Sequence, residues 1–523
     1  MSRPKFLFIA LALLTGWRLA LLPTQELGPD EAFIALQASR PWGIDFSLHG
    51  PLPGWLAWLS MSLAGHGPFG VRLLAPLLAA ACSWMVWRLA RGVFDRHVAG
   101  WSLVILNLLP AFNLAAVSWT PSILVTTSLL GSALCLRRVL TQAHHRDRWW
   151  MGAGGCLVAA FLSSPGAVVG IAAVGAALAL PRRRRHHLRE RGFLILLATA
   201  APAILLWLIW QSRHGWPLGD SGAWRPDLWL IPGWFRWVIL ISPLLLIVFL
   251  LAFRSAVWRA TDRGSSSLIL GFTLPLAAVD LFYGPNDRWP EMGLSAWMAF
   301  AAIFAGHFAV TARLPRLEDR ISWRTITLGF AALQTVFLLN TDFVRTLGLP
   351  WQFQKQTTGT DWVRFFTQDP SGTQRGWKTT ATLLQDALVS TQFDADTTGR
   401  YFVIARTWGL ASCLNASLPE GAPCLWPTPT HPRVHALQDP ADFSHPFAFQ
   451  PRYDAQSGED GSPFAGQDAL YITDDPDHQQ PPREIRRAFD HTRLLTLTRV
   501  IHGGWEVREV RIFACYGYRP PDF

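Results

Sequence analysis

The 523-residue chain has little charge, few cysteines and no P-loop. Charged residues make up 16% of the chain, and Cys, Met and Tyr occur six times each. No CxxC pair is present, so a zinc site built on paired cysteines is not expected. No Gly-Lys pair is present either, which excludes a P-loop nucleotide site. Acidic residues number 36 against 46 basic ones, and the net charge is +10.

Hydrophobic sequence, in contrast, is abundant. Half of the residues are hydrophobic, and 27 are Trp, which favours the headgroup level at helix ends. Apolar runs of about 17–25 residues, the length that spans hydrocarbon, continue to about residue 343. We therefore predict a polytopic α-helical membrane domain over residues 1–343. Its predicted spans, about eleven, are 5–22, 69–87, 98–116, 121–138, 149–163, 165–180, 193–210, 233–253, 265–283, 290–311 and 325–343. The first lacks a small-x-small cleavage site, so we expect it to be retained.

The basic residues cluster in alternate loops. Placed on the cytoplasmic side together with the N-terminus, they satisfy the positive-inside rule at each turn of the chain. The cytoplasmic clusters are Arg88, Arg91 and Arg96; Arg137, Arg138, Arg146 and Arg148; Arg182–Arg185; Arg254, Arg259 and Arg263; and Arg313, Arg316, Arg320 and Arg324. The run Arg182–Arg185 with His186 and His187 is assigned to a solvated loop, and no nucleic-acid partner is expected. This orientation puts residues 23–67 and the chain from 344 onwards outside.

The first external loop, about 23–67, is the longest outside segment between predicted spans, and long loops often carry function. It contains two apolar pieces, Phe33–Arg40 and Pro53–Ala64, that are too short to span comfortably. We predict that both lie along the outer surface as interfacial helices, because Trp55 and Trp58 favour that depth.

Residues 344–523 are polar and mixed, and predict a separate water-soluble domain. Helices are predicted at Gly376–Ser390 and Pro482–Phe489, and strands at Tyr401–Ala405, Ala469–Thr473, Leu494–Ile501 and Trp505–Ala514, the last two as a hairpin around Gly503-Gly504. Strands alternating with helices predict a small α/β domain. A Cys413–Cys424 bridge is an option if this domain lies in an oxidising compartment. Cys82, Cys135 and Cys156 lie in apolar runs and are expected to be small core residues.

Two adjacent carboxylates, Asp30 and Glu31, follow the first span almost at once. Gly28-Pro29 before them predicts a helix start, with both acids beside free N–H groups. One interpretation is that the acids only complement the helix dipole. The other is that a carboxylate at a membrane face acts as a general base. The local sequence favours the first interpretation, and the rest of the chain has to decide.

Several motifs follow one another along the chain. They are Asp30-Glu31-Ala32-Phe33, Trp42-Gly43, His49-Gly50-Pro51-Leu52 with Trp55, Phe69–Leu73, Trp210–Trp216, Asn286–Pro290, Asp369-Pro370 and Arg375-Gly376-Trp377. In this order they resemble the protein-mannosyltransferase-like glycosyltransferases of GT-C type, and among them the bacterial relatives of the lipid A aminoarabinose transferases. The resemblance covers nearly the whole chain.

This resemblance implies a GT-C-like membrane domain with an external α/β domain in the bacterial inner membrane, the C-terminal domain being periplasmic. It also implies transfer of a sugar from a polyprenyl-phosphate donor to a lipid, glycan or protein acceptor on the periplasmic face. Asp30 matches the catalytic position of the family. Glu31 lies about 100° round the same helix and is expected to orient a partner or bind a metal.

A leaving lipid phosphate needs cations or a metal to meet its charge. Arg72 and Arg288, near outer ends of spans, are the candidate phosphate-binding residues, with an interfacial anchor or a structural ion pair as the alternative. His49 and His214 match family positions on outer loops. Both are candidates to bind substrate or, together with Glu31, a divalent metal ion; hydrogen bonding is their alternative role.

Three positions depart from the family pattern. Leu48 stands where an Asp often precedes the loop histidine, and Ser122 follows Thr120-Pro121 where the family usually has the Asp of a Pro-Asp pair. Ser163-Ser164-Pro165 replaces a stretch that carries a cation. Each change removes a group that would serve metal or phosphate binding. A catalytically divergent scaffold or sugar-lipid-binding subunit therefore stays as the alternative function. A transporter ranks third, because the predicted spans carry few charges away from their ends.

Overall fold

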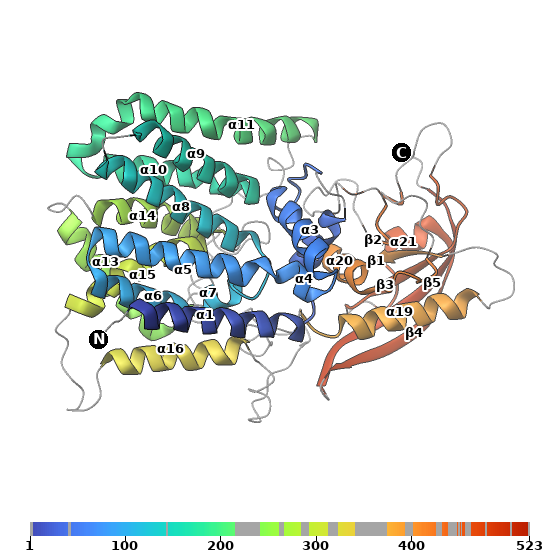
Figure 1. The fold of residues 1–523 in the computed structure, drawn as a ribbon. Helices are drawn as coiled ribbons and strands as arrows, with labels where there is room; N and C mark the ends of the chain where they lie inside the picture. Colours follow the sequence, from blue (N-terminus) through green and yellow to red (C-terminus); the bar gives the residue numbers. More distant parts are fainter. Residues whose placement is uncertain are drawn as a thin grey trace. The chain divides into compact units, whose positions relative to one another are not determined.

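The computed structural model describes residues 4–39, 43–142, 145–214, 241–260, 266–283, 292–311, 323–339, 374–392, 401–424, 431–437, 447, 450, 452–454, 462–475, 479–502 and 505–520. The chain divides into two compact units (Figure 1). The membrane unit comprises Met1–Leu22 and Trp42–Val344, and the C-terminal unit comprises Pro23–Pro41 and Arg345–Phe523. Each has its own hydrophobic core.

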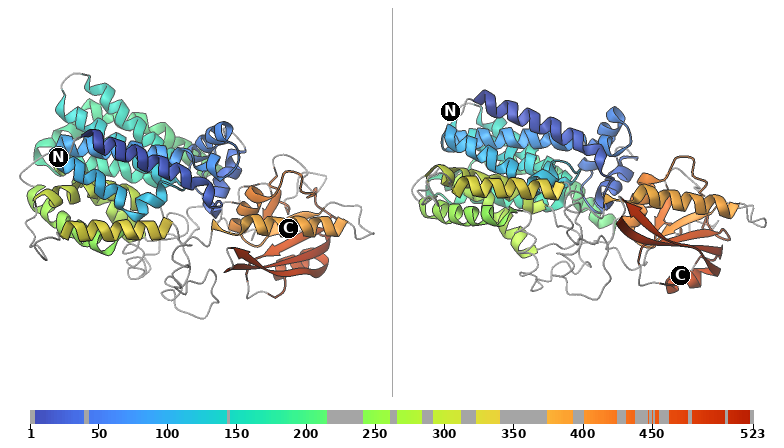
Figure 2. Two further views of the ribbon diagram at one scale, coloured as in Figure 1. Left: turned by 60° about the horizontal axis from the view of Figure 1, so that its bottom comes forward. Right: turned by 90° about the horizontal axis from the view of Figure 1, so that it is seen from below.

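The membrane unit is a bundle of helices that lie side by side (Figure 1, Figure 2). Its described helices are α1 (Pro4–Leu21), α3 (Leu52–Ala64), α4 (Pro68–Arg72), α5 (Leu74–Val93), α6 (Arg96–Leu108), α7 (Pro110–Ala115), α8 (Pro121–Thr141), α9 (Arg146–Ser163), α10 (Val169–Ala179), α11 (Arg191–Arg213), α13 (Pro243–Ala260), α14 (Ser266–Tyr283), α15 (Met292–Thr311) and α16 (Trp323–Leu339). Short 3-10 turns are η1 (Leu22–Thr24), η2 (Pro165–Val168) and η3 (Arg182–Arg189).

Helix is present in each of the eleven predicted segments, so the helical membrane fold is confirmed. Among the described residues, four helices are long and apolar enough to cross a membrane: Phe6–Thr24, Pro68–Val93, Pro121–Thr141 and Arg191–Arg213. The number of crossings stays a prediction. The predicted span 98–116 is broken at Leu109-Pro110, because Pro110 has no N–H to continue the helix and instead begins α7.

Small residues let the helices of the bundle approach closely. A Cβ added to Gly306 of α15 would lie 2.3 Å from Ser102 Oγ of α6, and one added to Gly271 of α14 would lie 2.2 Å from Ala177 Cα of α10. Lipid supplies no hydrophobic force between helices, so this close van der Waals packing holds the bundle together.

The C-terminal unit is built on a five-stranded mixed sheet of order β2-β1-β3-β5-β4. Its strands are β1 (Phe402–Ala405), β2 (Val434–Ala436), β3 (Ala469–Thr473), β4 (Phe489–His502) and β5 (Trp505–Tyr518). β1 pairs in parallel with β2 and β3, whereas β5 pairs antiparallel with β3 and β4. The helices are α2 (Pro29–Ala38), α19 (Trp377–Gln392), α20 (Trp408–Ser417) and α21 (Arg483–Ala488).

The predicted α/β domain is therefore present, with both predicted helices and all four predicted strands. The short strand β2 and the helix α20 were not predicted. The suggested Cys413–Cys424 bridge is wrong, since both cysteines are buried as thiols and no disulfide joins them. The thiol of Cys413 instead donates a hydrogen bond to the carbonyl of Leu27, with 3.8 Å between sulfur and oxygen.

The first external loop is divided between the units, which differs from the prediction that all of 23–67 belongs to the membrane domain. Pro53–Ala64 is helical as α3. The other predicted interfacial helix, Phe33–Arg40, is wrong in place and bounds. It is part of α2, and its apolar residues Ala32, Phe33 and Ile34 are buried within the C-terminal unit rather than facing lipid.

Candidate functional site

The acid pair lies at the start of α2, as predicted. Gly28 is the N-cap and Pro29 the first helical residue. Glu31 is only 2% exposed, and its Oε2 accepts a hydrogen bond from the N–H of Gly28 at 3.1 Å. This bond satisfies an N–H that the helix itself cannot use, so Glu31 stabilises the helix start. Asp30 is half-buried and lies beside it. The two carboxylates therefore have different environments.

Helix α2 is held in place by α20. The ring of Phe33 lies 6.4 Å from that of Trp408 and 5.8 Å from that of Phe447. A Cβ added to Gly409 would lie 3.3 Å from Pro29 Cβ, so a small residue is needed where the two helices meet. Fully burying an aromatic ring stabilises a fold by roughly 1.5–3 kcal/mol. The position of Asp30 is therefore set by packing inside the C-terminal unit.

A third acid, Glu26, joins the same segment to α19. Its carboxylate accepts hydrogen bonds from the backbone N–H groups of Trp377 at 2.5 Å and Lys378 at 3.4 Å. These N–H groups belong to the first two residues of α19, where the helix dipole favours negative charge. The guanidinium of Arg508 lies 3.3 Å from the centre of the Trp377 ring and donates to the carbonyl of Arg375 at 2.7 Å. Residues 26–31 are thus anchored at two places in the C-terminal unit.

Charged groups gather around this anchor. Burial raises the pKa of Asp474, and the nearby Arg508 opposes that shift. Burial lowers the pKa of Arg508, and Asp474 opposes it in turn. Burial raises the pKa of the Cys413 thiol, and the negative charges of Asp30 and Glu31 add to the effect. The acid pair therefore lies within electrostatic reach of the C-terminal unit's buried groups.

His49 lies in the membrane unit, where the tip of the first loop meets the end of α9. The N–H of Gly50 donates to the carbonyl of Ser163 at 3.0 Å. A Cβ at Gly50 would lie 1.9 Å from the carbonyl oxygen of Leu162, so only glycine fits. Burial lowers the pKa of His49 to about 3, and its buried Nε2 has no hydrogen-bond partner among the described residues. His49 is therefore neutral at physiological pH.

His214 follows the end of α11 and is exposed. Its ring stacks on the ring of Trp210, with 4.3 Å between centroids, and its Nδ1 donates to the carbonyl of Trp210 at 2.7 Å. Phe46 of the first loop contacts the same Trp210 ring at 6.0 Å. The loop and the end of α11 are therefore neighbours, although one nitrogen of His214 already serves its own helix.

Arg72 ends α4 and is 2% exposed. Its Nη1 donates to the carbonyl of Leu22 at 3.2 Å, just beyond the end of α1. This buried cation satisfies a carbonyl that helix α1 leaves free. The second predicted cation, Arg288, lies outside the described residues, as do the motifs Asn286–Pro290 and Asp369-Pro370.

The positions that depart from the family pattern are filled by neutral side chains. Ser122 lies in the first turn of α8, is 5% exposed and shares a hydrogen bond with the hydroxyl of Thr120 at 3.0 Å. Ser164 lies at the break between α9 and η2 and is 4% exposed. Leu48 is half-buried beside His49. None of these side chains supplies a charge.

The predicted metal ligands do not form a metal site within either unit. Glu31 belongs to the C-terminal unit, whereas His49 and His214 belong to the membrane unit. Glu31 already accepts from Gly28, and Nδ1 of His214 is used on Trp210.

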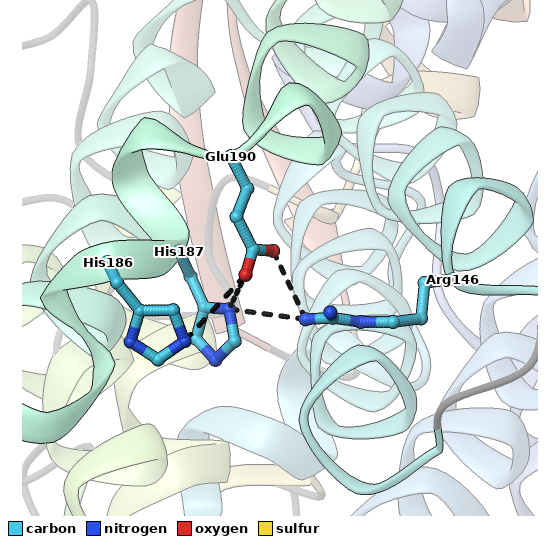
Figure 3. Close-up of polar contacts among 4 residues, drawn as sticks. All are labelled: Arg146, His186, His187 and Glu190. Carbon is cyan, nitrogen blue, oxygen red and sulfur yellow. Dashed lines mark hydrogen bonds and ion pairs between the residues drawn. The ribbon is translucent and has the colours of Figure 1, made fainter.

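Over the described ranges, one group of potential ligands does lie close together: His186, His187 and Glu190 (Figure 3). Glu190 Oε1 lies 2.9 Å from His187 Nδ1 and 3.7 Å from His186 Nε2. Arg146 lies among them, its Nη2 3.1 Å from Glu190 Oε2 and 3.2 Å from His187 Nδ1. Burial lowers the pKa of His187, and Glu190 opposes that shift. Because a guanidinium already balances the carboxylate, the cluster joins η3 to α9 as an ion pair and disfavours a metal cation.

Sequence reasoning missed the anchoring residues Glu26 and Arg508, and gave no role to Arg18. Glu26 is one more acid near a helix start, and Arg508 one more cation in a strand, so nothing in the sequence marks either. Arg18 does carry a signal, because an arginine inside an apolar helix is rare.

Comparisons with known proteins agree with the predicted resemblance. The sequence profile of the family "Dolichyl-phosphate-mannose-protein mannosyltransferase" matches residues 48–210. A search of curated protein sequences finds no match. Two crystal structures of ArnT from Cupriavidus metallidurans, one in the apo state and one bound to undecaprenyl phosphate, each superpose with a TM-score of 0.55. They are 15% and 16% identical, and in both cases 98% of this chain and 97% of that chain are covered. The resemblance is thereby confirmed, in sequence for residues 48–210 and in fold for the chain.

Proposed function

We propose that the protein is a membrane glycosyltransferase that moves a sugar from a polyprenyl-phosphate donor to an envelope acceptor on the periplasmic face of the bacterial inner membrane. The observation that carries the proposal is the difference between the two acids that begin α2. Glu31 is buried and bonded to Gly28, whereas Asp30 is half-buried at the same helix end. A mannosyltransferase family pattern in residues 48–210 and an ArnT-like fold support it.

In this mechanism Asp30 is the general base. Its carboxylate takes the proton of an acceptor hydroxyl while that oxygen attacks the anomeric carbon of the sugar. A new carbon–oxygen bond forms, the bond from the anomeric carbon to the phosphate oxygen breaks, and the carrier leaves as polyprenyl phosphate. General-base assistance of this kind contributes roughly 10²–10⁴-fold. Glu31 keeps the helix start in place and therefore acts as a positioning residue.

The charge that develops on the leaving phosphate needs a cation. Arg72 is our candidate within the described residues, since it is buried at the end of α4 beside the end of α1. Arg288 remains a candidate from the sequence. His49 is a candidate hydrogen-bonding residue and not a cation, because burial lowers its pKa. His214, on the neighbouring helix end, is a candidate for acceptor or sugar contact.

The donor class is proposed from the carrier's chemistry. A long polyprenyl chain partitions into lipid, and a protein with apolar membrane helices is suited to hold it beside a site at the membrane surface. ArnT from C. metallidurans, which shares the fold, was crystallised with undecaprenyl phosphate.

A scaffold or sugar-lipid-binding subunit is the second candidate function. The observation that favours it is the set of neutral side chains at Leu48, Ser122 and Ser164, where the family carries charged groups. Such a subunit would bind the lipid-linked sugar but would not turn it over.

The test is turnover by the purified full-length protein in proteoliposomes with a panel of polyprenyl-phosphate sugars and an extract of envelope lipids and glycans. We expect stoichiometric release of polyprenyl phosphate and a sugar-sized mass gain on an acceptor. Binding of the lipid-linked sugars without release across the panel would favour the scaffold. Mass analysis of envelope lipids and glycans from cells with and without the gene would identify the acceptor.

A further inference from the structure

Arg18, in the last turn of α1, is a buried cation that lacks a counter-ion among the described residues. Its side chain is 0% exposed. Nη2 donates to Asn107 Oδ1 at 3.1 Å and to Asn113 Oδ1 at 2.7 Å, and the guanidinium lies 5.6 Å from the centre of the Phe112 ring. The remaining N–H donors of the guanidinium, on Nε and Nη1, are buried and have no acceptor in the described part of the chain.

The two asparagines cannot balance this charge, because they are neutral and their own donors are already used. Asn107 Nδ2 donates to Ser83 Oγ at 3.0 Å, and Asn113 Nδ2 donates to the carbonyl of Leu109 at 3.0 Å. Both amides are therefore fixed with their oxygens toward Arg18. An unpaired charge inside a membrane bundle is costly, and such residues usually mark a functional site.

The place of Arg18 suits an anionic ligand. It lies one helical turn before Leu22, whose carbonyl accepts from the buried Arg72 at 3.2 Å. Two buried arginines thus flank the end of α1, which the positive-inside rule predicts to be its outer end. The carbonyl of Leu22 is bonded to Arg72 and is not an acceptor for the Nε and Nη1 donors of Arg18.

A lipid has a path to this site. Helix α1 lies at the edge of the bundle: most of its apolar residues are not buried, and Leu13 and Trp17 are 71% and 42% exposed. A ligand that arrives through the bilayer meets α1 before it meets the core. Because Arg18 is fully buried, binding of such a ligand requires α1 to move away from the bundle locally.

We propose that Arg18 is a second phosphate-binding residue, whose Nε and Nη1 donors take the phosphate-monoester oxygens of a long-chain lipid carrier, in addition to Arg72, which bonds to the carbonyl of Leu22 just beyond the same helix. This rests on the proposed function, in which the carrier is a polyprenyl phosphate. The ligand supplies the charge that the bundle lacks, so the site is complete only when the carrier is bound.

The test is binding of undecaprenyl phosphate to the full-length protein in detergent, measured as Kd and as the ligand-induced rise in melting temperature. Arg18→Met keeps the length of the side chain and removes the charge. Loss of charge-assisted hydrogen bonds is expected to raise Kd about 10- to 100-fold and to abolish the ligand-induced rise. The matched control is Arg91→Met on α5, because Arg91 is an exposed arginine stacked on Trp87; its Kd should stay within about twofold. Phosphatidylglycerol and inorganic phosphate serve as competing probes and are expected not to displace the carrier.

The outcomes separate the alternatives. A folded Arg18→Met protein with unchanged Kd would make Arg18 a structural link to Asn107 and Asn113 and would overturn the proposal. Equal competition by phosphatidylglycerol or inorganic phosphate would overturn it as well, since the site would then accept any phosphate. If Arg18→Met does not fold, Arg18→Lys decides: it keeps the charge but loses the guanidinium's donors, so a Kd raised severalfold supports the proposal and an unchanged Kd contradicts it. Wild-type protein that fails to bind the carrier would count against the proposed function itself, whereas binding that is insensitive to Arg18 would count only against this inference.

Discussion

At the scale of single residues, the division of labour between Asp30 and Glu31 follows from their surroundings. Both are carboxylates in the first turn of α2, and their local sequence does not show which of them is buried. Only Glu31 is buried against the helix start and bonded to Gly28. The carboxylate of Glu31 is buried and bonded to a backbone N–H, so it is poorly placed to take a proton from a substrate, whereas Asp30 is more exposed.

His49 gives a prediction in pH. Burial lowers its pKa from the ordinary 6.5 to about 3, so the unfolded chain takes up a proton that the folded protein does not. Stability from this group is therefore complete above pH 6.5 and is lost as the pH falls toward 3. Between pH 7 and pH 5 the wild type should lose up to about 2 kcal/mol of unfolding free energy that His49→Gln does not lose. Denaturant unfolding in detergent at both pH values measures the difference.

The control for His49 is His66→Gln, since His66 is exposed in the loop between α3 and α4. That variant should keep the pH dependence of the wild type. If His49→Gln and the wild type lost the same stability on acidification, the buried, neutral state of His49 would be wrong.

At the scale of elements, the contact between the first loop and α9 depends on one glycine. A Cβ at Gly50 would lie 1.9 Å from the carbonyl oxygen of Leu162, and backbone cannot yield as a flexible side chain can. Gly50→Ala should therefore displace the loop, at a cost of at least about 1–3 kcal/mol in unfolding free energy, and should lower turnover. Gly67→Ala is the matched control, because no atom lies within 4 Å of the added Cβ. Equal melting temperatures and turnover in the two variants would contradict the close contact.

Which elements the sequence could predict follows from the signal each carries. The apolar segments and the long strands β4 and β5 have clear periodicity, and the structure has helix or strand there. β2 is three residues long and α20 follows a strand closely, so neither offers enough repeats to stand out. α2 was predicted as a helix start but placed at the membrane surface, because apolar residues that pack on a protein domain and those that face lipid have the same composition.

The candidate site was predictable only where a local sequence motif marks it. Asp30 carries a motif, and its helix start was expected from Gly28-Pro29. The motif is held in place by two contacts between residues more than 350 positions apart. Glu26 accepts from the N–H of Trp377 at the start of α19, and the ring of Phe33 packs against that of Trp408. No local pattern reports such contacts. The predicted metal ligands Glu31, His49 and His214 belong to different units, so a metal shared by them stays a prediction.

At the scale of the whole molecule, loop charge predicts the first external loop and the C-terminal unit on one side of the membrane and η3 on the other. Cysteines introduced at Ile44 and Leu497, which are 47% and 54% exposed, should react with an impermeant reagent in intact spheroplasts. A cysteine at the exposed Arg189 should react only after lysis. The native cysteines are buried or half-buried, which keeps the background low. Labelling in the reverse pattern would overturn the orientation and, with it, a periplasmic site.

The measurement that tests the central claim most directly is sugar transfer by Asp30→Asn, normalised to folded protein, beside the wild type and Glu31→Gln. Asn keeps the size and hydrogen-bonding capacity of Asp30 but cannot take a proton, so transfer should fall about 10²–10⁴-fold while the melting temperature changes little. Glu31→Gln keeps an acceptor for the N–H of Gly28 and should instead lower stability by roughly 0.3–1 kcal/mol, with turnover per folded molecule nearly retained. Wild-type turnover in Asp30→Asn would contradict its role as the general base.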